Sequence, residues 1–97
     1  MAWITEPSEP TAIREGLLVK VRAGYIVPEE ILIEEIKRRK KLHQQKLAYY
    51  HSIEAEINTA ELTRPQLHMY LPLRCGIRYE TSWIEWCDEA IAMLEQN

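Results

Sequence analysis

The three histidines and two cysteines are the side chains best suited to chemistry, because they bind metals and act as bases or nucleophiles. His43 and His51 are eight residues apart, which places them about 80° apart around a helix. His68 stands apart from both, and no His-Glu-x-x-His or Cys-x-x-Cys motif occurs. Cys75 and Cys87 are about 18 Å apart along one predicted helix, too far for a disulfide. We therefore expect no metal, no cofactor and no catalytic centre.

Residues 37–41, Lys-Arg-Arg-Lys-Lys, form a basic run that could bind phosphate. Successive helical residues turn by about 100°, so these side chains surround the helix instead of lining one face. Glu34 and Glu35 precede Arg38 and Arg39 by four residues, which is the favourable order for ion pairs along a helix. The net charge of -3 also opposes unaided binding to nucleic acid. The sequence predicts no direct DNA binding by this chain.

Four aromatic residues, Tyr49, Tyr50, Trp83 and Trp86, could stack on an aromatic ligand. Their helical spacing is more typical of residues that anchor a core or an interface. A glycine-rich phosphate loop is absent, and no Ser-His-Asp or Cys-His arrangement can be read from the sequence. We therefore predict association chemistry and no enzyme activity.

All these residues are predicted to lie on helices, because strand-like alternation is absent and glycine occurs only at positions 16, 24 and 76. Residues 1–10 form a proline-containing tether, and residues 11–23 form a short helix that Gly24 ends. A long helix is expected from Pro28 to about residue 60, with heptad-like apolar spacing. After a turn at residues 62–66, a last helix covers residues 65–95, and Pro72 should kink it or end a first short piece. The predicted fold class is all-α.

Opposite charges predict that the two long helices pack as an antiparallel hairpin. If the chain reverses near residue 64, side chains of opposite sign come to face each other. The expected pairs are Lys40 with Asp88, Arg39 with Glu89, and Arg74 with Glu54. Exposed pairs of this kind contribute about 0–1 kcal/mol each, so they select the register more than they stabilise the hairpin.

The last helix carries apolar side chains on two faces, which is more than one partner helix can cover. One face contains Ile77, Ile84, Cys87, Ile91 and Leu94, and the other contains Cys75, Tyr79, Trp83, Trp86, Ala90 and Met93. A surface helix of a small monomer has a single apolar stripe. Another copy of the chain or another domain is therefore expected to cover the second face. We expect another copy, which makes a homodimeric, coiled-coil-like arm. The residues expected at this dimer or packing interface are Leu47, Tyr50, Tyr79, Trp83, Ile84, Trp86, Ile91 and Leu94.

Three segments of the chain resemble one known family. The segment Ile13-Arg-Glu-Gly-Leu-Leu-Val-Lys-Val-Arg-Ala-Gly24 is followed by a long charged helix and then by Leu73-Arg-Cys-Gly-Ile-Arg-Tyr-Glu-Thr-Ser-Trp-Ile-Glu-Trp86. This pattern resembles the C-terminal domain of PadR-like transcriptional regulators, and in length the virulence-activator-like subfamily. Trp3-Ile4-Thr5-Glu6-Pro7 is similar to the segment that leaves the winged helix-turn-helix domain in that family.

The resemblance implies a dimerising, regulatory helical domain at residues 11–97 and a tether at residues 1–10 that leads from a winged-helix DNA-binding domain. That N-terminal domain is not among these 97 residues. Effectors in the family bind near the junction of the two domains, which makes Trp3 the candidate effector contact. Its planar ring could stack on a planar ligand, or simply dock the tether onto the first helix.

Two alternatives to a regulator's own C-terminal domain remain open. One is a free-standing helical partner that modulates a full-length regulator by pairing with it. The other is a small all-helical enzyme of the chorismate mutase type, which the apolar inward positions of the long helix disfavour. No run of residues suits a membrane span or a signal peptide, and two unpaired cysteines suit a reducing compartment, so we expect a cytoplasmic protein.

Overall fold

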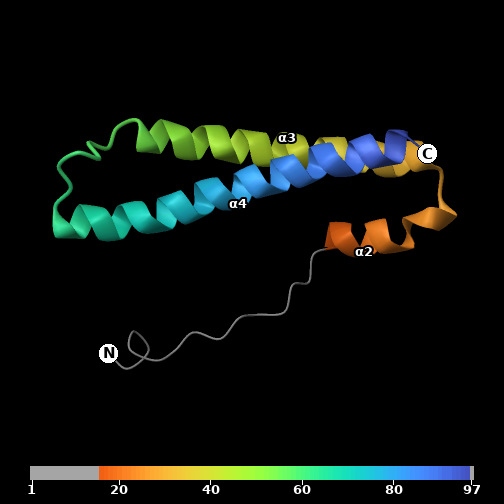
Figure 1. Ribbon diagram of the computed structural model, residues 1–97, viewed down its shortest axis with the longest axis horizontal. Coiled ribbons are helices and arrows are strands. Elements are labelled where there is room, and N and C mark those ends of the chain that lie inside the picture. The colour runs from red at the N-terminus through yellow and green to blue at the C-terminus, as the bar shows by residue number, and fades with distance from the viewer. Residues whose placement is uncertain (1–15, 97) are drawn as a thin grey trace, which may run out of the picture.

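The computed structural model describes residues 16–96, and the regular structure in this range is entirely helical (Figure 1). The elements are α2 (Gly16–Ala23), the 3-10 helix η1 (Gly24–Ile26), α3 (Glu29–Glu54) and α4 (Arg64–Glu95). This confirms the predicted all-α class and the order of a short helix followed by two long ones. The tether at residues 1–10, Trp3 included, and the first part of the expected helix at residues 11–23 lie outside the described residues.

Helix α3 begins close to the predicted position and ends earlier than predicted. Pro28 precedes the first helical residue, and two glutamates occupy the first turn, where negative charge favours the helix dipole. The predicted end near residue 60 is wrong, because the helix stops at Glu54. Beyond it, the Asn58 side chain accepts a hydrogen bond from the backbone N–H of Ala60 at 3.1 Å. Such a local bond gives the backbone an alternative to the helix.

Helix α4 begins with a capping box. The Thr63 hydroxyl accepts a hydrogen bond from the Gln66 backbone N–H at 3.3 Å, and the Gln66 side chain accepts one from the Thr63 N–H at 2.8 Å. Pro65 lies in the first turn, where its missing N–H removes no helical hydrogen bond. These local signals start the helix at the position that the sequence indicated.

Of the two outcomes expected at Pro72, a kink or the end of a first short piece of the last helix, the second is wrong, since α4 continues through this residue. Proline removes one backbone donor from the helix. Side chains on both sides of Pro72 are held to α3: the Tyr70 hydroxyl and an Arg74 Nη1–H donate to Glu54 Oε2 at 2.9 and 2.8 Å. The second of these bonds confirms the predicted pairing of Arg74 with Glu54.

Helices α3 and α4 run side by side in opposite directions (Figure 1). Lys40 Nζ lies 2.5 Å from Asp88 Oδ1, as the predicted register requires. The guanidinium of Arg39 lies over the Trp83 ring, 5.0 Å from its centroid, so the pair with Glu89 stays a prediction. The antiparallel hairpin is therefore confirmed, with charge pairs at two points along it.

The core lies where α2 covers the hairpin, at the N-terminal end of α3 and the C-terminal end of α4 (Figure 1). Lys20 of α2 bonds to Glu35 of α3 at 2.8 Å. A Cβ at Gly24 would stand 2.9 Å from Leu32 Cδ2, so glycine permits this close approach of η1 to α3. Each buried leucine or isoleucine of the core contributes about 1.5–3 kcal/mol. The core residues are Leu17, Leu32, Ile36, Cys87 and Ile91.

Candidate association surface

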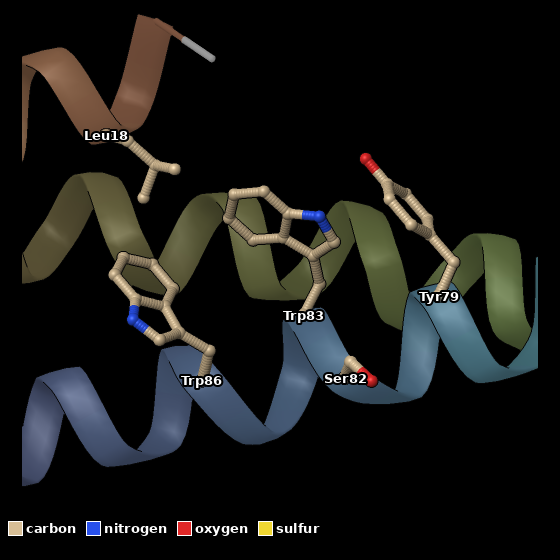
Figure 2. A pocket seen from close by; sticks show the side chains of 5 residues that line it. All are labelled: Leu18, Tyr79, Ser82, Trp83 and Trp86. Carbon is tan, nitrogen blue, oxygen red and sulfur yellow. The ribbon is translucent and has the colours of Figure 1, made fainter. Parts of the chain in front are cut away.

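The described residues leave one side of α4 accessible beside α2. Five side chains from α2 and α4 line a hollow of about 310 Å³ there (Figure 2). In Figure 2, Trp83, Trp86 and Tyr79 rise from α4 and Leu18 points toward them from α2. The lining is almost entirely apolar, with Ser82 as the fifth residue. Such a hollow suits an apolar side chain of a partner more than it suits a charged ligand.

The two predicted faces of α4 differ in burial. The first face is covered by the chain itself, since Ile77, Cys87 and Ile91 are buried and Ile84 and Leu94 half-buried. The second face is not, because Tyr79 is 55% exposed and Met93 61% exposed. Trp83, Trp86 and Ala90 are half-buried, and Cys75 is exposed. One apolar face of α4 therefore lacks a complete partner among residues 16–96.

Trp83 is held by contacts on several sides. Its ring stacks on the His43 imidazole at a centroid distance of 5.0 Å and an angle of 8°. Trp86 meets it edge to face at 5.5 Å, and Arg39 lies over it as a cation–π contact. Aromatic pairs of this kind contribute about 0.5–1.5 kcal/mol each beyond area burial. The tryptophan at the centre of the hollow is thus preorganised and not free to reorient.

Beneath Trp83, the structure buries an ionisable pair that the sequence did not predict. His43 Nδ1 is hydrogen-bonded to Glu80 Oε2, and the two residues are only 7% and 2% exposed. The spacing of residues in the sequence could have indicated this burial. Glu80 follows Ile77 by three residues and precedes Ile84 by four, so it lies on the same helix face as these apolar residues.

A second hollow of about 580 Å³ adjoins the first and shares Tyr79 with it. Two exposed apolar residues of α3, Leu42 and Tyr49, form part of its wall. Its other lining residues are Arg39, His43, Gln45, Lys46 and Glu80. The accessible apolar face of α4 therefore continues across the groove onto α3. We call this combined face, made by Leu18, Leu42, Tyr49, Tyr79, Trp83 and Trp86, the aromatic face.

Some of the predicted interface residues lie away from the aromatic face. Ile91 is buried in the chain's own core. Leu47 and Tyr50 are half-buried on α3, and the Tyr50 ring packs where a Cβ at Gly76 would be 3.0 Å from it. These positions serve packing within the chain, whereas Tyr79, Trp83 and Trp86 remain partly accessible.

The described residues offer little for catalysis or metal binding. No group of three or more His, Cys, Asp and Glu side chains within residues 16–96 is placed to hold a metal ion. Burial raises the pKa of the Cys87 thiol, and the neighbouring Asp88 raises it further, so the thiolate is disfavoured. The Tyr70 hydroxyl and Arg74 lower the pKa of Glu54 by hydrogen bonding to its carboxylate. Each of these ionisable groups is thus accounted for by packing or pairing.

The fold places the chain among helical hairpin domains, and the comparison with known families gives the class. Residues 13–95 match the family described as Virulence activator alpha C-term. The match covers most of the chain, so the chain belongs to this family of C-terminal domains. Within residues 16–96, none of the helices is both long and apolar enough to cross a membrane.

One relative is a probable transcriptional regulator, and one similar solved structure is that of a virulence activator. A probable transcriptional regulator of Mycobacterium tuberculosis is 30% identical over an alignment of 107 positions, gaps included, that spans 98% of this chain and 57% of the regulator. The structure of the Vibrio cholerae virulence activator AphA is similar with a TM-score of 0.87 and 26% identity, over 98% of this chain and 57% of that one. The chain thus spans a little over half the length of each relative.

Proposed function

We propose that this chain is the dimerisation and regulatory domain of a PadR-like transcriptional regulator, and that two copies associate through the aromatic face. The observation that carries the proposal is the second apolar face of α4, which residues 16–96 leave uncovered. Family membership supports a role in transcription regulation. A domain of a DNA-regulating protein would act in the cytoplasm.

The free energy of burying the aromatic face favours association of two copies. Burying one aromatic or aliphatic side chain contributes about 1.5–3 kcal/mol, whereas association costs about 4–15 kcal/mol in lost freedom of motion. A two-fold interface uses the same patch on both copies, so each residue of the aromatic face counts twice. Tyr79 and Tyr49 start more than half exposed, which leaves most of their burial energy for association. Aromatic anchors of this type dominate the energy of many interfaces.

The regulatory mechanism we propose is geometric. Two paired arms would set the separation of two DNA-reading domains, and the spacing of DNA half-sites would follow that separation. A small molecule that prefers one arm geometry would shift DNA affinity through that preference. Trp3 remains our candidate for contact with such an effector.

The charges of α3 support a regulator over a small helical enzyme. An enzyme of the chorismate mutase type needs several basic side chains directed into one pocket. Here Lys40 pairs with Asp88, Lys37 lies 4.0 Å from Glu34, and Arg39 stacks on Trp83. Three of the five residues of the basic run are therefore engaged in contacts on different sides of the helix, which supports our prediction of a non-enzyme that does not itself bind DNA.

Sedimentation or light scattering at micromolar concentration tests the proposal. We expect twice the chain mass of 11.5 kDa for the parent protein. Tyr79→Lys places a charge on the aromatic face and should yield a monomer with unchanged helical circular dichroism. Tyr25→Lys is the matched control, since Tyr25 is 89% exposed and lines neither hollow, and it should remain dimeric. A fully helical parent that sediments as a monomer would overturn the proposal.

A further inference from the structure

The buried pair of His43 and Glu80 stands out in the seam between α3 and α4. Both side chains are more than nine-tenths buried, and two buried apolar residues lie near them in the sequence: Ile36 two turns before His43 on α3, and Ile77 one turn before Glu80 on α4. The imidazole lies face to face with Trp83 and edge to face with Tyr79, at 5.0 and 6.5 Å. The pair thus touches two residues of the aromatic face from inside the hairpin.

A gain in folding stability does not explain why His43 and Glu80 are buried together. A buried pair of ionisable groups gives up hydration that its mutual bond repays only with complete hydrogen bonding, and apolar residues of similar volume are often as stable or more so. His43 Nε2 is buried and has no hydrogen-bonding partner among residues 16–96, so the bonding is incomplete. Such a pair is therefore expected to have a role other than raising the free energy of unfolding.

The pair does fix geometry. If α3 slid along α4 by one turn, Glu80 would move away from His43, and His43 would come opposite Gly76 or Ile84 and be left buried without its partner. Breaking a buried pair in this way is far more costly than breaking an exposed pair such as Lys40 with Asp88. Single buried polar groups set register and association state in helical coils by the same principle.

We propose that His43 and Glu80 are specificity-determining residues: their buried bond selects one α3–α4 register and thereby holds Trp83 and Tyr79 in the geometry that makes a single dimer. The inference rests on the proposed dimerisation and adds the residues that decide its specificity. Both act as positioning residues, because they support the aromatic face from below without forming its outer surface.

The test compares His43→Leu, Glu80→Met and the double variant with the parent. Each single variant leaves one polar group buried alone, and its urea midpoint should fall by more than about 1 M. The double variant should unfold at or above the parent's midpoint. Its dimer should nevertheless dissociate at least about tenfold more readily, or give mixed species in sedimentation. In the double variant, the NMR signal of the Trp83 indole N–H should split from the single peak of the parent into several. A Trp83→Phe variant assigns this signal.

The exposed pair provides the matched control. The double variant Lys40→Met with Asp88→Leu should change the dimer dissociation constant less than about threefold, because exposed pairs contribute little. Glu80→Gln keeps a hydrogen-bond acceptor for His43 and should retain a single Trp83 signal.

Three outcomes are decisive. If the apolar double variant forms the parent's dimer with equal affinity and one Trp83 peak, the pair does not determine specificity. If it unfolds as readily as the single variants, the pair is a stabilising contact and the inference fails. A parent that is monomeric overturns the proposed dimerisation instead, and the number of Trp83 peaks in the double variant then decides whether the pair selects the register.

Discussion

Truncating Trp83 to alanine should destabilise the protein more than any other change on the aromatic face. The Trp83 ring stacks on His43, meets Trp86 edge to face and makes a cation–π contact with Arg39. It is half-buried before any partner binds. Truncation of a fully buried tryptophan costs about 3–5 kcal/mol. Partial burial lowers that figure and the lost ring contacts raise it, so we expect about 2–3 kcal/mol.

Thermal unfolding followed by circular dichroism measures this loss. For a domain of this size, 1 kcal/mol corresponds to about 4–8 °C, so the midpoint should fall by about 8–24 °C. The melt is repeated at a tenfold higher protein concentration, because a dimer's midpoint rises with concentration. Met69→Ala, at a 75% exposed site on the same helix, is the control and should change stability by less than about 0.5 kcal/mol.

A Trp83→Ala variant that melts within about 2 °C of the parent would contradict this expectation, since less than about 0.5 kcal/mol would then be lost. The ring would in that case make no net packing contribution. A drop in midpoint that is the same at both protein concentrations, with an unchanged dimer mass, would assign the tryptophan to the monomer's packing alone.

Two further predictions concern ionisable groups. Hydrogen bonds from Tyr70 and then Arg74 lower the pKa of Glu54, so its stabilising contribution is present above its usual value of 4.5 and is lost as the pH falls below that value. Tyr70→Phe should therefore move the acid-unfolding midpoint to higher pH, and an unchanged midpoint would show that the bond does not stabilise the hairpin. Because burial raises the pKa of the Cys87 thiol and Cys75 is exposed, a thiol reagent at pH 8 should modify Cys75 much faster. Equal rates for the two thiols in the folded protein would contradict the packing of the core.

The helices and their pairing could be predicted from the sequence, because both follow from local and periodic properties. Apolar spacing indicated the two long helices, the turn at residues 62–66 placed the start of the last one, and opposite charges at Lys40 and Asp88 indicated the register. Helical periodicity also showed that α4 has two apolar faces. These features depend on side chains a few residues apart, or on simple charge matching, and they need no knowledge of tertiary contacts.

Which side chains are buried together could not be predicted without the tertiary structure. Glutamate is usually found at the protein surface. Glu80 is buried because α3 brings His43 opposite it, in a contact between residues 37 positions apart in the chain. The same packing carries α4 through Pro72, where local propensity alone predicts a break. It also decides which face of α4 is covered by α3 and which remains accessible, because both faces are equally apolar in the sequence and only the position of α3 distinguishes them.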